Sequence, residues 1–284
     1  ESCVGVIEAK RKSKDIPGVL TQAERYARDL DYPHLVDGAP YEGAPRDAKG
    51  DFSPTFKVPF AFATNGRPHV KQLKEKSGIW YRDLRSSMNH PRDLPAWHSP
   101  GDLLSKLEQE PQRSEQALAE EPFDYANLRY YQRDAITAIE EAIGEGRDTA
   151  LISMATGTGK TRMAIALMYR ALKHRRFRRI LFLVDRNALA EQTKDGLANT
   201  ELEGLLKFTD TYSVIGPDDG MPDEDTRVHV ATVQSMVARV FRSSEGRPTP
   251  GMYDLVIVDE AHRGYALDGE LSDEDIEFRS TEDY

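Results

Sequence analysis

The sequence predicts an α/β protein of two domains, the second of which is built on a parallel sheet. Three apolar runs at residues 180–184, 228–232 and 255–258 end in polar residues and are separated by helical patterns, which is typical of parallel strands joined by helices. A glycine-rich turn at residues 155–161 opens a further helix. Between residues 86 and 122, five prolines divide charged helical pieces, and we interpret this stretch as the connection between the domains.

Composition narrows the class of protein. The chain has 284 residues, of which 39% are apolar, and this is enough for two cores. Its net charge of −10 argues against a protein that coats nucleic acid everywhere, but a local basic face remains possible. The single cysteine, Cys3, excludes an internal disulfide and fits a reducing compartment. With no apolar run near the ~18 residues that span a bilayer, we expect a cytoplasmic protein without a membrane partner. We also expect the chain to be a fragment, since it starts within what reads as a domain.

Residues 151–161 read as a buried strand that runs into a phosphate-binding turn. Glycines in this turn let backbone N–H groups point inward, Lys160 can reach the β- and γ-phosphates, and Thr161 offers a hydroxyl to Mg²⁺. Met154 stands where the generic loop begins with glycine. The turn resembles motif I of superfamily 2 helicases and translocases. The ATP-binding residues predicted in it are Ala155, Thr156, Gly157, Thr158, Gly159, Lys160 and Thr161.

The N-terminal run at residues 4–10 reads as a strand with a carboxylate and an amine at its end. Glu8 and Lys10 are two residues apart, so their side chains share one face. A metal held by Glu8 and a water oriented or deprotonated by Lys10 could therefore sit together, as metal-assisted phosphodiester hydrolysis requires. A surface ion pair would leave the same pattern. Gln22 and Tyr26 follow at helical spacing on one face.

This Glu-x-Lys strand followed by Gln-x-x-x-Tyr resembles the RecB-like branch of the PD-(D/E)xK nucleases. The resemblance implies that Glu8 and Lys10 are catalytic, that Glu8 binds a metal, and that Gln22 and Tyr26 support the site. It also implies an aspartate on an earlier strand, which we expect upstream of this chain. We expect residues 1–85 to be the C-terminal part of this domain, with strands at 56–64, turned at 65–66, and at 78–81. Residues 31–55 should be a surface excursion, and His69, His90 and His98 should be surface or packing residues.

The second domain, residues 125–284, should follow a linker at residues 86–124. Gln132 precedes the phosphate loop in an Arg-Tyr-Tyr-Gln run, where an amide beside aromatic rings can recognise adenine. The run resembles the helicase Q motif, and Arg129, Tyr130 and Gln132 complete the predicted ATP site. Beyond the loop we expect a helix at residues 162–172 and a basic stretch at 173–179, either solvated or in contact with DNA.

Two segments are candidates for contact with the DNA backbone. Residues 185–192 follow the strand at 180–184, resemble motif Ia, and offer Arg186 and Gln192. The strand at 228–232 should end in a polar turn similar to the motif Ib region, where Thr232, Gln234 and Ser235 could bond phosphates. His229 in that strand should be packed, and residues 210–225 should form a solvated acidic loop.

Residues 253–262 carry the second strong nucleotide signal. Four consecutive apolar residues predict a fully buried parallel strand, and two carboxylates emerge at its end. Asp259 would hold Mg²⁺, and Glu260 would orient or deprotonate the water that attacks the γ-phosphate. His262 would couple the nucleotide state to a second motor domain. The pattern is similar to motif II.

In this order, a restriction-endonuclease-like nuclease part, a linker and a RecA-like P-loop domain resemble the restriction (R, HsdR) subunit of type I restriction-modification enzymes. The resemblance implies an ATP-driven translocase on double-stranded DNA that cleaves DNA with Mg²⁺ and works with methyltransferase (M) and specificity (S) subunits. Two alternatives stay open: a superfamily 2 DNA or RNA helicase without nuclease activity, and a non-catalytic ATP-gated DNA-binding module.

Overall fold

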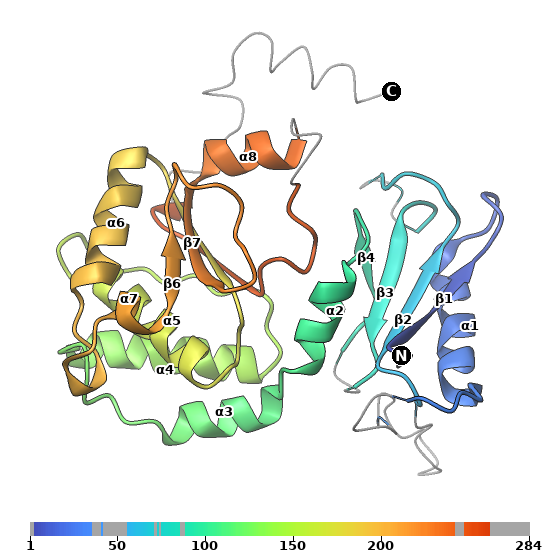
Figure 1. Cartoon of the computed structure of the whole chain (residues 1–284), viewed down its shortest axis with the longest axis horizontal. Helices are drawn as coiled ribbons and strands as arrows, with labels where there is room; N and C mark the ends of the chain where they lie inside the picture. Colours follow the sequence, from blue (N-terminus) through green and yellow to red (C-terminus); the bar gives the residue numbers. More distant parts are fainter. Residues whose placement is uncertain are drawn as a thin grey trace, which may run out of the picture.

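The computed structural model describes residues 3–35, 41, 56–70, 73, 75–85, 89–241 and 247–261. They form two lobes, each built around its own sheet, and the connecting helices lie between and beneath them (Figure 1). The predicted α/β class is confirmed. None of the described helices is long and apolar enough to cross a bilayer.

The first lobe is a four-stranded sheet in the order β1-β2-β3-β4 with a helix on each face. Its strands are β1 (Gly5–Ala9), β2 (Phe60–Thr64), β3 (Ile79–Asp83) and β4 (Arg92–Leu94), and only β1 and β2 are parallel. Helix α1 (Ile16–Asp29) packs Ile16, Leu20 and Ala23 against one face. Helix α2 (Pro100–Leu107) places Leu103 and Leu107 against the other.

Two boundaries of the first lobe differ from those expected. Strand β2 starts at Phe60, because Phe56 forms only an isolated bridge with Tyr41. Strand β4 lies within the range expected to be linker, so the sheet continues to Leu94. Most of residues 31–55, the expected surface excursion, lie outside the described part.

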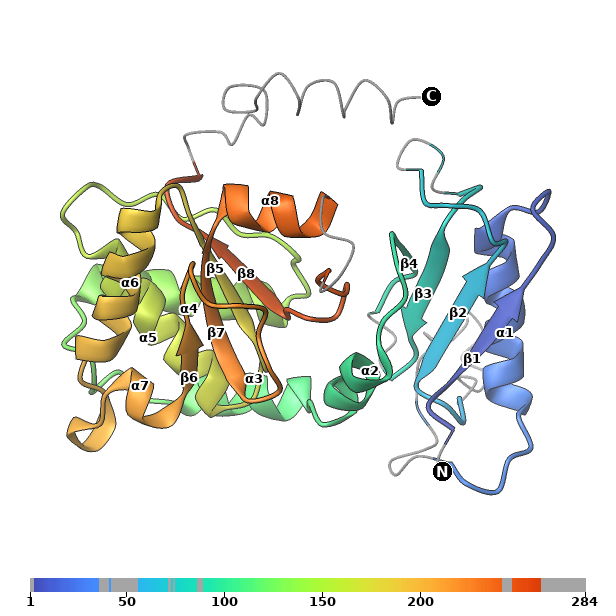
Figure 2. The same cartoon turned by 45° about the horizontal axis from the view of Figure 1, so that its top comes forward.

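The second lobe is a parallel sheet in the order β6-β7-β5-β8 (Figure 2). The strands are β5 (Ile180–Val184), β6 (Ser213–Ile215), β7 (Thr226–Thr232) and β8 (Leu255–Val258). The helices are α4 (Tyr130–Gly144), α5 (Lys160–Lys173), α6 (Asn187–Asn199), the short 3₁₀ turn η2 (Glu203–Leu205), α7 (Phe208–Thr211) and α8 (Val233–Phe241). Helix α5 is almost entirely buried, from Met163 to Leu172, and forms the centre of the core.

Two expected strands of this lobe differ from the prediction. Residues 151–154 form no strand, and Leu151 is 85% exposed. Strand β8 is an edge strand in the described sheet, and its residues Val256 and Val258 are 49% and 38% exposed. A fully buried strand needs neighbouring strands at both edges and packing on both faces of the sheet, and within the described residues β8 pairs with β5 alone.

Two expected loops also contain regular structure. Strand β6 lies inside the range expected to be an acidic loop and pairs with β7. The expected polar turn after β7 is the start of α8, where the Ser235 N–H donates to Thr232 Oγ1 at 3.2 Å and Ser235 Oγ donates to the Thr232 carbonyl at 2.9 Å. The first of these bonds satisfies a backbone N–H group that a helix start leaves without an intrahelical partner.

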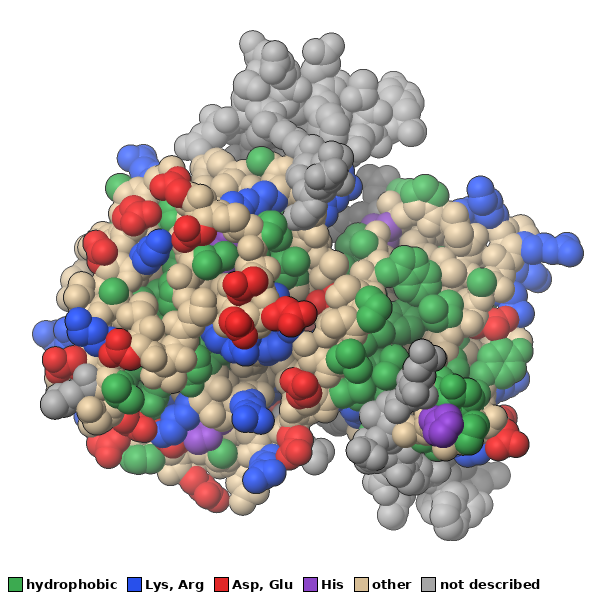
Figure 3. Space-filling model, in the orientation of Figure 1, with side chains coloured by type: hydrophobic (Ala, Val, Ile, Leu, Met, Phe, Trp, Pro, Cys, Tyr) green, Lys and Arg blue, Asp and Glu red, His purple; other side chains and the backbone are tan. Residues whose placement is uncertain are grey.

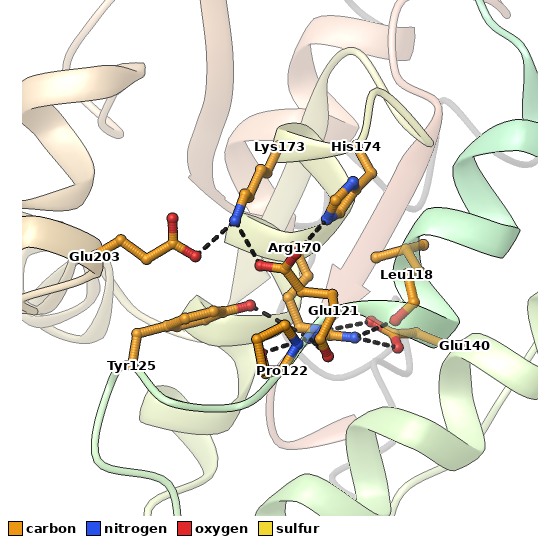
Figure 4. A network of polar contacts seen from close by, with 9 residues as sticks. All are labelled: Leu118, Glu121, Pro122, Tyr125, Glu140, Arg170, Lys173, His174 and Glu203. Atoms are coloured by element: carbon orange, nitrogen blue, oxygen red, sulfur yellow. Dashed lines mark hydrogen bonds and ion pairs between the residues drawn. The ribbon is translucent and has the colours of Figure 1, made fainter.

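A buried arginine holds the connection against the second lobe (Figure 4). Arg170 of α5 is 1% exposed and donates to both carboxylate oxygens of Glu140 on α4, at 2.6 and 2.9 Å. It also donates to the carbonyls of Leu118, at the end of α3 (Pro111–Glu120), and of Glu121, at 2.6 and 3.1 Å. The connection is therefore bonded to the core of the second lobe.

The basic stretch at residues 173–179 is also used within the chain. Lys173 bridges Glu121 and Glu203 at 2.5 and 2.6 Å, and His174 Nε2 lies 3.0 Å from Glu121. Arg179 is 5% exposed and donates to the carbonyl of Thr226 at 2.9 Å. Lys173, His174 and Arg179 are thus used within the chain, because carboxylates and carbonyls distant in sequence bind them, whereas Arg175 is exposed.

The lobes meet where α2 lies against residues 247–254. Thr249 Oγ1 donates to Asp102 Oδ2 at 2.6 Å, and Gln109 Nε2 donates to Asp254 Oδ2 at 3.1 Å. A Cβ on Gly251 would lie 2.6 Å from His98 Nδ1 and 2.7 Å from the Asp102 Cβ. The contact therefore requires that one partner have no side chain.

We predict that Gly251→Ala loosens the contact between the lobes, because a methyl group cannot occupy a position 2.6 Å from the His98 ring. The expected result is faster limited proteolysis within residues 108–124 of the full-length protein. Gly220→Ala is the matched control, since a Cβ there meets nothing within 4 Å. Equal cleavage rates for the two variants would contradict the prediction.

His98 gives a second prediction. Its ring is 7% exposed, lies 4.9 Å from the Tyr81 ring, and neither nitrogen has a hydrogen-bond partner in the described structure. Desolvation lowers its pKa to about 4, so the folded state holds it neutral while the unfolded chain binds a proton near pH 6.5. Its contribution to stability is present above pH 6.5 and is lost as the pH falls to 4.

His98→Phe should therefore reduce the loss of stability on acidification. At pH 4.5 we expect the variant to be more stable than the unsubstituted protein by about 2 kcal/mol, relative to their difference at pH 7. Urea unfolding at the two pH values measures this, with exposed His90→Phe as the control. His229, whose pKa burial also lowers to about 4, keeps part of the pH dependence in both proteins.

Candidate functional site

The phosphate loop adopts a conformation that depends on its glycines. Gly157 and Gly159 have φ values of 78° and 80°, in the left-handed region that favours glycine. A Cβ on Gly157 would meet nothing within 4 Å, so the outer face of the turn is open, whereas a Cβ on Gly159 would lie 2.6 Å from Gln132 Nε2. Thr158 closes the turn by donating its N–H and its hydroxyl to the Ala155 carbonyl at 3.4 and 2.6 Å. Helix α5 begins directly after it, at Lys160.

Gln132 lies beneath this loop and holds it. Its side chain is 2% exposed, and Nε2 donates to the carbonyls of Thr158 and Gly159, both at 3.0 Å. Its Oε1 accepts from the Arg129 N–H at 2.8 Å. Both amide hydrogens are thus used by the loop, whereas the sequence led us to expect them at an adenine edge. Tyr130, also expected at the base, is 75% exposed.

A cavity of about 240 Å³ lies beside the loop. Its lining residues are Tyr131, Ala135, Ile152, Ser153, Met154, Ala155 and Thr158. Tyr131 was not among the residues expected from the sequence, although it stands next to Gln132 in the same run. Its hydroxyl donates to the Thr158 carbonyl at 3.1 Å and accepts from Arg129 Nη1 at 3.0 Å. An aromatic and apolar cavity next to a phosphate loop suits a flat base.

Two motifs far apart in sequence meet in the site. Lys160 Nζ lies 2.8 Å from Glu260 Oε1, with side chains 30% and 25% exposed. Glu260 has a φ of 51°, which is strained for a residue with a side chain, and its N–H donates to Asp259 Oδ1 at 2.9 Å. Asp259 continues β8 by donating its N–H to the Leu183 carbonyl. Thr161 is exposed in the first turn of α5, and His262 lies outside the described residues.

The second candidate site lies at the end of β1. Lys10 Nζ is 2.5 Å from Glu8 Oε1, and Gln22 Nε2 donates to the Tyr26 hydroxyl at 2.7 Å. The hydrogen bond to Glu8 raises the pKa of Lys10, so Lys10 is a cation at neutral pH. Of the two roles expected from the sequence, the charge favours orienting a water over deprotonating one.

The candidate DNA contacts fall into two groups. Arg186 is 74% exposed in its side chain and lies 3.4 Å from Asp185, and Gln192 and Gln234 are exposed on α6 and α8. Thr232 is 6% exposed, and Thr232 and Ser235 use their hydroxyls in the first turn of α8. The first three side chains are exposed to solvent, whereas the last two stabilise a helix start.

Both lobes match models of known protein families. Residues 1–107 match the family model described as type I restriction enzyme EcoKI endonuclease subunit, second domain, and residues 125–280 match the model described as type III restriction enzyme, res subunit. The chain is 43% identical over 99% of its length to the type I restriction enzyme EcoKI endonuclease subunit of Escherichia coli strain K12. It is 29% identical over 93% of its length to the EcoAI endonuclease subunit of Escherichia coli. The chain spans 25% and 28% of these relatives.

The Lys160–Glu260 pair predicts an effect on nucleotide affinity. The pair holds the ammonium that must reach the phosphates, so Glu260→Gln should bind a non-hydrolysable ATP analogue with Mg²⁺ about two- to fivefold more tightly, as loss of a part-exposed ion pair allows. Titration calorimetry measures this. Glu145→Gln, which removes a surface pair with Arg147, is the control. Weaker binding by Glu260→Gln alone would contradict the prediction.

Proposed function

The chain belongs to the restriction-enzyme res-subunit family and is homologous to type I endonuclease subunits over nearly its whole length, and we propose that it is part of the motor and endonuclease subunit of a type I restriction-modification system. The proposed activity is ATP-dependent translocation on double-stranded DNA coupled to DNA cleavage. The observation that carries this proposal is the presence, in one chain, of a phosphate loop paired with Glu260 and a strand end carrying Glu8 and Lys10.

In the proposed ATP site, the base lies in the cavity beside Tyr131 and the phosphates lie on the open face of the turn. The residues fit this substrate, because Gly157 leaves that face free and the N-terminus of α5 points its amides and positive dipole end there. Lys160 gives up its ion pair with Glu260 and binds the β- and γ-phosphates instead. Glu260, once released, orients the attacking water.

Mg²⁺ fits the same site through the oxygens that it prefers, the Thr161 hydroxyl and the Asp259 carboxylate. When bound, it would neutralise charge on the phosphates. Within the described residues no group of three or more His, Cys, Asp or Glu side chains is suited to hold a metal. His262 is proposed to couple this site to a second motor domain.

In the proposed nuclease site, Glu8 binds a divalent metal and Lys10 orients the attacking water with its positive charge. The hydrogen-bonded pair Gln22–Tyr26 supports them from α1. We propose that an aspartate from another part of the full-length protein completes the metal site. The proposed division is a nuclease part at residues 1–85, whose sheet extends to Leu94, a linker up to 124, and the first motor domain at 125–284.

The proposed partners are double-stranded DNA and the M and S subunits, and the proposed location is the cytoplasm. Arg186, Gln192 and Gln234 would contact the DNA backbone from the exposed side of the second lobe. Thr232 and Ser235 would contact the DNA backbone only through the hydrogen-bonding capacity that their bonds in α8 leave unused.

The deciding experiment uses the full-length subunit with its M and S partners and long unmethylated DNA in Mg²⁺ and ATP. Lys160→Ala should abolish both ATP hydrolysis and cleavage, because it removes the phosphate ligand. Lys10→Ala should abolish cleavage and leave DNA-stimulated ATP hydrolysis intact. Lys207→Ala, an exposed lysine remote in sequence from both motifs, is the matched control.

Each of the other outcomes supports a different function. ATP hydrolysis without cleavage in the unsubstituted complex would support a superfamily 2 helicase whose first domain does not cut. Binding of ATP and DNA with neither activity would support an ATP-gated DNA-binding module.

A further inference from the structure

Two loops leave the first sheet at the same edge. Strands β1 and β2 are parallel and end in register at Ala9 and Thr64, so the loop at residues 10–15 and the loop that starts at residue 65 emerge side by side. Figures 1 and 2 both place these loops together at one end of the first lobe. The Lys10 N–H donates to the Thr64 carbonyl at 2.9 Å, which ties the start of one loop to the end of the neighbouring strand.

Asn65 fastens the two loops together. Its side chain is 2% exposed, and Nδ2 donates to the carbonyls of Lys14 and Lys76, at 3.0 and 2.9 Å. A backbone bond from the Ile16 N–H to the Glu75 carbonyl, at 2.9 Å, reinforces the link. The described residues of these loops, 10–15, 65–70 and 75–78, therefore form a single preformed surface, held by a buried amide whose two hydrogens are both used.

This two-loop surface carries an excess of positive charge. Among the described residues, its exposed cations are Arg11, Lys12, Lys14, Arg67 and Lys76, and its exposed carboxylates are Asp15 and Glu75. No ion pair within the described residues includes any of these five cations. In the space-filling view, Lys and Arg gather over the turn that follows β1 (Figure 3). Such an excess is local, because the whole chain has a net charge of −10.

We propose that the two-loop surface binds the phosphate backbone of double-stranded DNA and delivers it to Glu8 and Lys10. This rests on the proposed nuclease function, since Lys10 is the first residue of the loop. The cations are spread over two exposed loops, an arrangement that fits an extended polyanion better than a small ligand. Asn65 is a positioning residue, which holds the cations in place before DNA arrives and so reduces the entropy lost on binding.

The test measures binding of a short DNA duplex to the full-length subunit in Ca²⁺ without ATP, as a function of salt concentration. Lys12→Gln with Lys14→Gln should weaken binding and reduce the slope of log K against log salt by roughly 1.8, the value expected for two lost phosphate contacts. Arg113→Gln with Arg147→Gln is the matched control, because it removes two exposed charges from the connection and the second lobe. An unchanged slope for Lys12→Gln with Lys14→Gln overturns the proposal. This outcome includes the case in which an acidic protein, and not DNA, binds this surface.

A second variant separates position from charge. Asn65→Ala removes the bonds that fasten the loops but no cation, so it should weaken duplex binding several-fold while thermal unfolding confirms a folded first lobe. Unchanged affinity would remove Asn65 from the proposal. If the unsubstituted complex cleaves no DNA but the lysine variant still shows a reduced slope of log K against log salt, the binding surface is supported and the nuclease function is not. If the unsubstituted complex cleaves DNA but the lysine variant shows an unchanged slope, the nuclease function is supported and the binding surface is not.

Discussion

The buried charge of Arg170 is the constraint on which the second lobe and its connection depend. A guanidinium removed from water destabilises the fold unless carboxylates and carbonyls surround it. Here Glu140, the Leu118 and Glu121 carbonyls and the face of the Phe123 ring, 4.1 Å away, meet this need. These partners come from α4 and from the connection, so the arginine cannot be satisfied unless the segments assemble. Helix α5 also begins at the phosphate loop, which puts the nucleotide site and the connection on one rigid element.

What the sequence could predict was local or set by the symmetry of parallel strands. The turn at residues 155–161 was predictable because left-handed backbone favours glycine. Lys160 and Glu260 were each predicted at the nucleotide site, and the structure brings their side chains together. Predictions from the sequence failed where a residue's contact partner is distant in the sequence. The cations at 173–179 look free until Glu121 and Glu203 are folded against them, and the apolar run of β8 looks buried until its neighbours are known.

Both candidate sites hold a lysine against a glutamate expected to take part in the same chemistry. The pairs are Lys10 with Glu8 and Lys160 with Glu260. In each, the carboxylate holds the ammonium in place, and an anionic substrate must compete with it. The role of Gln132 is similar, because the loop uses the amide that a base would need.

The contact at Gly251 has a mechanical consequence for the two lobes. The Gly251 main chain lies so close to the His98 ring that not even a methyl group fits between them, which leaves little room for the lobes to turn further toward each other at this point. Two hydrogen bonds, from Thr249 and Gln109, resist movement in the opposite direction, and such bonds can break and re-form. The contact at Gly251 therefore limits how closely the two lobes can approach each other. It leaves their separation as the direction in which the first lobe can move.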